Sequence, residues 1–77
     1  FTGSVETGKA IYKNSSEKLI PVTLELGGKS PMIVCEDVDL DKVVQGALAS
    51  MRFTRQGQSC TAASRIFVHE AIFDPFL

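Results

Sequence analysis

The spacing of apolar residues is most regular between residues 37 and 53. Apolar side chains recur there every three or four residues, on one face of a helix: Leu40, Val43, Val44, Ala47, Leu48 and Met51. The acidic residue that caps this helix is Asp37 or Asp39, because a carboxylate can accept the free N–H groups of the first turn. The pattern therefore predicts a helix with one buried face.

Shorter segments complete an alternating order of strands and helices. Residues 21–26 alternate between apolar and polar side chains, with Leu24 and Leu26 on one side and Glu25 on the other, as in a strand. The apolar run at 32–35 predicts a buried strand with Cys35 packed in the core. The remaining predictions are a strand stub at 1–2, a helix from Ser4 to a polar break at 14–16, a strand at 64–70, and a helix at 72–77 with Pro75 in its first turn. This order predicts an α/β fold with parallel strand pairing.

Composition and charge exclude several classes of function. The 8 basic and 9 acidic side chains are mixed along the chain, so no basic block predicts a nucleic-acid partner. No apolar run approaches the roughly 20 residues that cross a bilayer, so we expect no membrane partner. Cys35 and Cys60 lack the spacing of metal ligands and His69 is the only histidine, so we expect no bound metal.

The length favours a segment of a larger protein. A chain of 77 residues is short for an independent fold. Its first residues read as the end of a strand and its last residues as the beginning of a helix. We therefore expect a fragment that is poorly folded and catalytically inactive on its own.

A glycine-rich turn precedes the first predicted helix. The stretch GSVETGK has the spacing of a P-loop, but Ala10 stands where that loop needs a hydroxyl for magnesium. A glycine turn that leads into a helix still offers free N–H groups and a positive dipole end to a phosphate or pyrophosphate. Considered alone, this segment favours an ordinary capped helix.

Two other side chains are candidates for chemistry. Glu25 stands at a predicted strand end before Gly27 and Gly28, where a carboxylate can act as a general base, although the pattern alone favours a solvent-facing glutamate. Cys60 lies in a small, polar loop that gives substrate access to a nucleophile, although a loop cysteine without a role is favoured when it is considered alone. His69 does not stand out as a base, so Glu25 is the better candidate partner for Cys60.

Together these motifs resemble the NAD(P)-dependent aldehyde dehydrogenase superfamily along the whole chain. FTGSVETG is similar to the family's FTGS-x-x-x-G coenzyme motif, LELGGKSP to its glutamate motif, and GQSC to the end of its F-x-N-x-G-Q-x-C cysteine motif, all in the family's order. The acidic helix start DVDLDKVV also matches. The resemblance implies that residues 1–25 end a Rossmann-like coenzyme-binding domain and that residues 26–77 begin an α/β catalytic domain that carries the thiol.

The resemblance also implies a role for each motif residue. Cys60 would attack the aldehyde to form a thiohemiacetal, which would pass hydride to NAD or NADP and become a thioester. Glu25 would activate the water that releases the carboxylic acid, and the main-chain N–H of Cys60 would help to hold the oxyanion. The coenzyme contacts would come from Gly3 and Ser4 at the pyrophosphate, Thr7 on the same side, and Leu26 and Gly27 near the nicotinamide.

Two positions depart from the family's pattern. Val5 stands where threonine is frequent, and Arg55 stands where the cysteine motif often has asparagine, so we expect altered loop contacts and leave open the substrate preference near the thiol. The family's oxyanion asparagine, ribose-binding glutamate and oligomerisation segment have no counterpart in these 77 residues. The resemblance implies a small-molecule aldehyde substrate and a homo-oligomer, dimer or tetramer, at full length.

The mechanism needs a free thiol, so we expect a reducing compartment, either the cytoplasm or an organelle matrix.

Two other functions remain open at this point. One is a nucleotide- or phosphate-binding module in which Cys60 is incidental, and the other is an inactive remnant with only a structural role.

Overall fold

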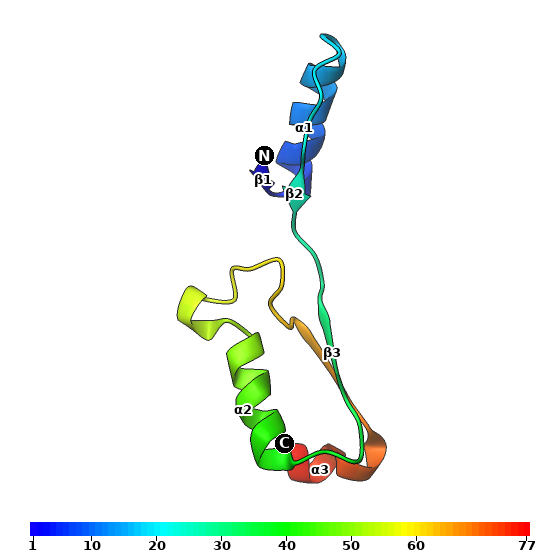
Figure 1. The fold of residues 1–77 in the computed structure, drawn as a ribbon, viewed down its shortest axis with the longest axis vertical. Helices are drawn as coiled ribbons and strands as arrows, with labels where there is room; N and C mark the ends of the chain where they lie inside the picture. Colours follow the sequence, from blue (N-terminus) through cyan, green and yellow to red (C-terminus); the bar gives the residue numbers. More distant parts are fainter.

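The computed structural model describes all 77 residues and consists of two β-α-β units joined end to end (Figure 1). The first unit contains strand β1 (Thr2–Gly3), helix α1 (Val5–Ser16) and strand β2 (Glu25–Leu26). The second contains strand β3 (Pro31–Val34), helix α2 (Leu40–Ser50) and strand β4 (Arg65–Val68). It is completed by two 3-10 turns, Phe53–Arg55 and Glu70–Ile72, and by helix α3 (Phe73–Phe76).

Each unit is held together by one parallel pair of strands. In the first pair Thr2 lies opposite Glu25, and in the second pair Pro31 lies opposite Arg65. Parallel strands cannot be joined by a tight turn, so each pair needs a crossover, which α1 and α2 provide. The predicted α/β class and parallel pairing are therefore confirmed.

Both long helices begin at residues that the sequence predicts. Ser4 Oγ accepts the Thr7 N–H at 3.2 Å and caps α1. Asp39, rather than Asp37, caps α2: its carboxylate accepts the Lys42 N–H at 3.3 Å and lies 3.0 Å from the Lys42 ammonium. The hydrogen bond with the Lys42 side chain, followed by that with its N–H, lowers the pKa of Asp39 below its ordinary value.

The first unit differs from the sequence prediction in two respects. Helix α1 continues through the predicted break at 14–16, where Ser16 Oγ donates to the Lys13 carbonyl at 2.7 Å instead of interrupting the helix. Strand β2 retains only the last two residues of the predicted strand 21–26, because its partner β1 is also two residues long. The predicted alternation still holds, since Leu26 is partly covered and Glu25 is exposed.

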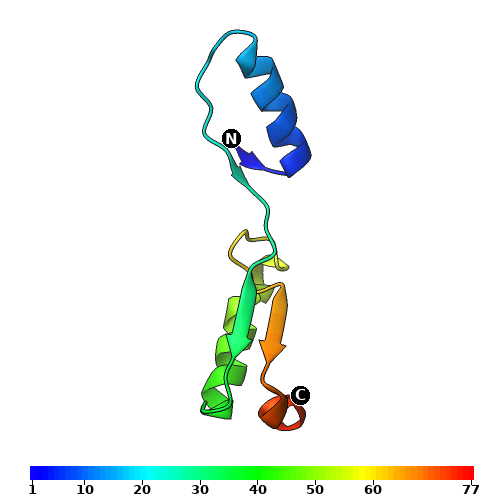
Figure 2. The same ribbon diagram turned by 90° about the vertical axis from the view of Figure 1, so that its right-hand side faces the viewer.

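Helix α2 lies alongside the β3–β4 pair (Figure 2). Ala47 on the predicted apolar face is buried, whereas Leu48 is 50% exposed. The prediction that Cys35 is packed in the core is wrong: its thiol is exposed, because β3 ends at Val34 and Cys35 lies beyond the sheet. The other predicted elements of this unit are present, with ends that differ by at most three residues.

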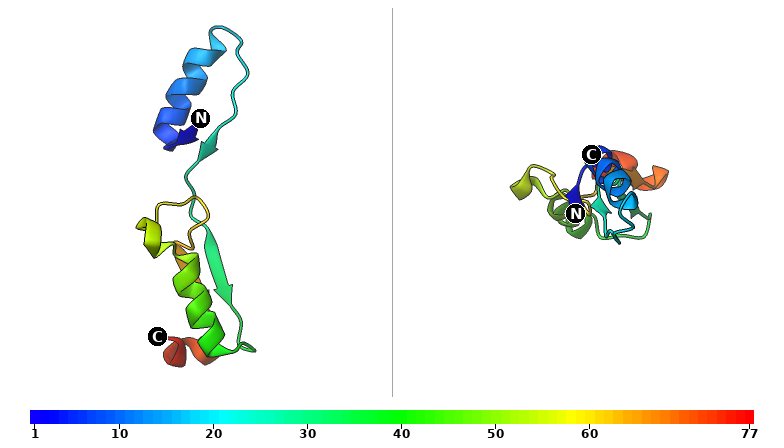
Figure 3. Two further views of the ribbon diagram at one scale, coloured as in Figure 1. Left: turned by 60° about the vertical axis from the view of Figure 1, so that its left-hand side comes forward. Right: turned by 90° about the horizontal axis from the view of Figure 1, so that it is seen from above.

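The molecule is elongated and has little core (Figure 3). Its dimensions are 55 × 24 × 15 Å and its radius of gyration is 17.8 Å, whereas a compact chain of this length has about 11–12 Å. Its accessible surface is 6239 Å², compared with roughly 4,600 Å² for a folded monomer of this mass. The 5 buried residues are Gly8, Val34, Ala47, Ala62 and Ala63.

We expect the isolated 77-residue chain to unfold without a cooperative thermal transition. With 5 buried residues, too little apolar surface is removed from water to offset the conformational entropy of the ordered backbone. Far-UV circular dichroism and calorimetry during heating would show a gradual loss of signal without a heat-capacity peak. A sigmoidal transition that both methods detect at one temperature would contradict this expectation.

Candidate active site

The two units meet at the carboxyl ends of β1 and β2. Because these strands are parallel, both end at the same edge, with Gly3 opposite Leu26. This edge faces the loop that leads from α2 to β4 and carries Cys60 (Figure 2). Ligands of open parallel sheets bind outside the carboxyl ends of the strands, which makes this junction the candidate site.

A cavity of about 560 Å³ lies at this junction. It brings together five of the predicted site residues, which come from three separate stretches of sequence: Gly3, Glu25, Leu26, Gly27 and Cys60. Gly28, Gln58, Ser59 and Arg55 also contribute to its wall. Glu25 provides the only carboxylate and Arg55 the only guanidinium among the lining side chains.

Ser4 and Thr7 do not line this cavity. They lie at the start of α1, where Ser4 Oγ donates to Thr7 Oγ1 at 3.0 Å and accepts the Thr7 N–H. The first N–H groups of a helix have no intrahelical acceptor, so this end of α1 retains donors for an anion. Ser4 and Thr7 therefore lie at the start of α1, which directly follows strand β1, and outside the cavity.

The backbone that leads to Cys60 adopts left-handed conformations at three positions. These are Arg52, Gln56 and Gly57, with φ of 56°, 57° and 73°. Glycine adopts this region without strain, which explains Gly57, whereas other residues lose roughly 1–2 kcal/mol each. Two strained residues in the stretch between α2 and a candidate nucleophile are consistent with a loop whose shape serves function.

The chain beyond Cys60 fixes this loop to the second unit. Ala62 and Ala63 are buried, and the Ala63 N–H donates to the Ser50 carbonyl at the end of α2 at 3.0 Å. The Cys60 thiol itself is exposed, and the main-chain N–H of Cys60 donates to no atom of the chain. The Cys60 thiol is therefore accessible, while the chain that follows it is fixed to the end of α2.

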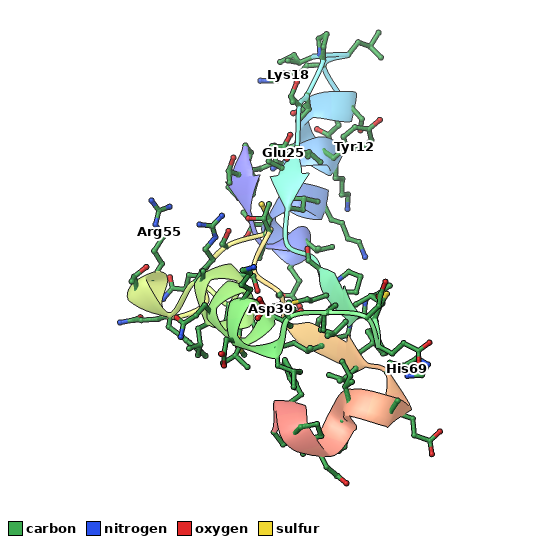
Figure 4. All side chains as sticks on the ribbon, turned by 60° about the horizontal axis from the view of Figure 1, so that its bottom comes forward. Tyr12, Lys18, Glu25, Asp39, Arg55 and His69 are labelled. Carbon is green, nitrogen blue, oxygen red and sulfur yellow. The ribbon has the colours of Figure 1, made fainter.

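The other titratable candidates lie elsewhere. Figure 4 shows Glu25 on β2 and His69 beyond the far end of β4. His69 Nδ1 accepts the Ala71 N–H at 3.2 Å and lies 3.8 Å from the Glu36 carboxylate, so it is not placed to act on Cys60. The structure contains no cluster of three His, Cys, Asp or Glu side chains arranged for a metal ion. None of its helices has the length and apolar character needed to cross a membrane.

Cys35 is also separate from Cys60. The Cys60 backbone lies beside Ser30, just before β3, and Cys35 follows the last residue of that strand. At about 3.3 Å per strand residue the two ends of this stretch are roughly 16 Å apart, beyond the reach of a disulfide. Both thiols are free in the structure.

Two further side chains at this junction give no signal in the sequence. Ser30 Oγ donates to the Cys60 carbonyl at 2.9 Å, and Arg65 donates to the Lys29 carbonyl from Nη2 at 2.6 Å and Nε at 3.1 Å. Ser30 directly precedes Pro31, and Arg65 is the residue that lies opposite Pro31 in the sheet. A correct register of two strands 34 positions apart in the sequence is needed to find these contacts, and no local pattern supplies it.

The parallel β-α-β units match solved α/β structures over almost the whole chain. The sequence profile of the aldehyde dehydrogenase family matches residues 1–77, and the chain belongs to this family. The family resemblance of the sequence is therefore confirmed.

Relatives with different named substrates are similar to this chain. The mitochondrial benzaldehyde dehydrogenase of Antirrhinum majus is 58% identical over 78 residues, which cover 100% of this chain and 14% of the relative. The probable betaine aldehyde dehydrogenase of Schizosaccharomyces pombe is 52% identical over 77 residues, 100% of this chain and 15% of the relative. The NADP+ succinate-semialdehyde dehydrogenase of Escherichia coli is 46% identical over 76 residues, 99% of this chain and 16% of the relative.

Two solved structures are similar in fold. The NAD+ complex of an aldehyde dehydrogenase from Bacillus cereus has a TM-score of 0.91 and 47% identity, and the match covers 99% of this chain and 15% of that one. The betaine aldehyde dehydrogenase of Staphylococcus aureus in complex with NAD+ has a TM-score of 0.92 and 46% identity, with the same coverage of 99% and 15%. The chain thus spans about 15% of the length of the proteins it resembles.

The close packing of α1 on β2 can be tested at Gly8. A Cβ at Gly8 would lie 2.7 Å from a terminal carbon of Leu26, a residue of the cavity wall. Gly8 lies inside α1, where alanine is favoured over glycine by about 0.5–1 kcal/mol, but displacement of the Leu26 side chain costs more than this gain. We therefore expect Gly8→Ala to lower the free energy of unfolding of the native polypeptide that carries these residues by about 0.5–1 kcal/mol. Urea denaturation measures this change.

Gly46→Ala is the matched control for this experiment. It lies within α2, and a Cβ there would meet no atom within 4 Å. Alanine favours a helix interior over glycine, so this variant should gain about 0.5–1 kcal/mol. Equal effects of the two substitutions would show that Gly8 is not in close contact with Leu26.

Proposed function

We propose that this chain is the part of an NAD(P)-dependent aldehyde dehydrogenase that carries the nucleophile and the base, and that the reaction is the oxidation of an aldehyde to a carboxylic acid. The observation that carries this proposal is the single cavity that brings Glu25 and Cys60 together with Gly3, Leu26 and Gly27. The membership of the chain in the aldehyde dehydrogenase family supports it. The similar enzymes named above act on several aldehydes, so the substrate class is a small-molecule aldehyde.

We propose that a flat coenzyme ring lies against the glycine-lined wall of this cavity. Its wall includes Gly3, Gly27 and Gly28, which present backbone instead of side chains. A Cβ at Gly27 would meet no atom within 4 Å, so a ring can approach the backbone there. When bound, NAD or NADP accepts the hydride that leaves the substrate carbon. We assign Gly3, Ser4 and Thr7 to the pyrophosphate side, next to the start of α1, and Leu26 and Gly27 to the nicotinamide side.

Cys60 forms the covalent bond to the substrate. Its thiolate attacks the aldehyde carbon to give a thiohemiacetal, and loss of hydride from that carbon leaves a thioester. The Cys60 N–H has no acceptor within the chain, which leaves it available to donate to the oxyanion. Glu25 then takes a proton from water, and the hydroxide attacks the thioester to release the acid and restore the thiol.

The same proposal covers the larger protein. The first strand pair ends at Leu26 and the second begins at Pro31, which supports a coenzyme-binding domain at residues 1–25, a catalytic domain from 26 to 77, and a boundary near residues 25–28. We propose a homo-oligomer, dimer or tetramer, for the full-length enzyme. A free catalytic thiol requires a reducing compartment, the cytoplasm or an organelle matrix, and two similar proteins are mitochondrial.

The role of Cys60 is tested by Cys60→Ser in the native polypeptide. We expect oxidation of aldehydes by NAD or NADP to fall by about a thousandfold or more, while the Kd of the coenzyme stays within about twofold. Cys35→Ser is the matched control, because Cys35 lies beyond β3 and outside the cavity. A protein that binds the coenzyme but oxidises no aldehyde before any substitution would instead be a binding module or an inactive remnant.

The role of Glu25 is tested by Glu25→Gln. We expect a rapid burst of reduced coenzyme followed by steady-state turnover about 10²- to 10⁴-fold slower, because the acyl-enzyme forms but is not hydrolysed. Stopped-flow absorbance separates the two phases. Glu36→Gln, next to His69 and outside the cavity, is the control and should show unaltered turnover. Unaltered turnover in Glu25→Gln as well would assign the base to another residue.

A further inference from the structure

The segment between Glu25 and β3 is attached to the Cys60 loop by a side chain that takes no part in the chemistry above. Ser30 Oγ donates to the Cys60 carbonyl oxygen at 2.9 Å, across 30 positions of sequence. The backbone approaches at the same point, since a Cβ at Gly28 would lie 3.8 Å from that oxygen. The peptide group that follows Cys60 is therefore contacted from the connection between β2, which carries Glu25, and β3.

A second attachment acts on the neighbouring peptide group. The Arg65 guanidinium donates twice to the Lys29 carbonyl, at 2.6 and 3.1 Å. Its central carbon also lies 5.6 Å from the centre of the Phe67 ring, which restricts the side chain. The residues on both sides of the Lys29–Ser30 peptide bond are thus anchored, one to β4 and one to the Cys60 loop.

These attachments matter because the path from Glu25 to β3 is flexible. It contains Gly27 and Gly28, which have the widest conformational freedom of any residue. With Lys29 and Ser30 anchored, only the short stretch through Gly27 and Gly28 separates Glu25 from the thiol loop, whereas without these anchors residues 27–30 can all move and the distance between Glu25 and Cys60 varies more. An error of about 1 Å in the placement of catalytic groups can cost roughly 100-fold in rate.

We propose that Ser30 is a positioning residue that fixes the relation between the base Glu25 and the nucleophile Cys60. This inference rests on the proposed function and extends it to a residue outside the cavity wall. Ser30 acts through the Cys60 carbonyl and leaves the Cys60 N–H free for the oxyanion. Arg65 supports it by holding the Lys29 carbonyl.

The test uses Ser30→Ala in the native polypeptide. Loss of the hydroxyl removes one neutral hydrogen bond, so kcat should fall about 3- to 10-fold while the KM for the aldehyde changes less than about twofold. Ser30→Thr keeps a hydroxyl and should restore kcat to within about twofold. Ser16→Ala is the matched control, because it removes a serine-to-carbonyl bond of 2.7 Å within α1, outside the cavity wall, and should leave kcat unchanged.

A double-mutant cycle separates positioning from a general effect on structure. In the Glu25→Gln background there is no base left to position, so Ser30→Ala should lower turnover less than about twofold. The full 3- to 10-fold loss in that background would overturn the proposal. So would a kcat for Ser30→Ala equal to the unaltered value, or a failure of Ser30→Thr to restore it.

A second variant tests the same attachment in case Ser30→Ala does not fold. Arg65→Lys keeps the positive charge but loses the paired donors to the Lys29 carbonyl, and it should lower kcat by about 2- to 10-fold. An unchanged kcat in both variants would overturn the role of the whole attachment.

The two levels of the proposal fail in different ways. If the native polypeptide oxidises no aldehyde, or still does so as Cys60→Ser, the proposed function and the positioning role both fail. If oxidation depends on Cys60 and Glu25 but is unaffected at Ser30, only the positioning role fails.

Discussion

The parallel pairing of β3 with β4 is the constraint on which the arrangement of the site depends. Parallel strands require a long crossover, and here α2 and the loop after it provide the crossover and return the chain to the edge where β3 begins. The loop that carries Cys60 is therefore brought beside the segment at residues 28–30, although 30 positions separate Ser30 from Cys60. An antiparallel return would place the start of β4, and the thiol loop before it, at the opposite end of β3.

The site lies where the carboxyl edge of one β-α-β unit meets the amino edge of the next. The first edge contributes backbone and one carboxylate, because β2 ends at Leu26 and continues into Gly27 and Gly28. The second edge contributes the thiol, the guanidinium of Arg55 and a loop with left-handed residues. Few residues are buried in either unit, and side-chain hydrogen bonds to main-chain carbonyls hold residues 29 and 30, just before β3, to β4 and to the thiol loop.

Local features of the structure follow closely from local patterns in the sequence. Ser4 and Asp39 cap the two long helices, and the apolar face of α2 contains the buried Ala47. The failures occur where a neighbour in space decides the outcome. Strand β2 is short because β1 is short, and Cys35 is exposed because the sheet ends one residue before it. Apolar character alone cannot show where a strand loses its partner.

The sequence by itself determined the family, the α/β class, the helix starts and the identity of the candidate nucleophile and base, because these depend on residue type and on spacing over a few residues. Only the tertiary structure decided that Glu25 and Cys60 line one cavity, that Arg55 joins them, and that Ser30 holds the Cys60 carbonyl. Those relations depend on strand register and on contacts between residues about 30 positions apart. The register and these contacts are set by the free energy of the whole fold, so they cannot be read from any short segment of the sequence.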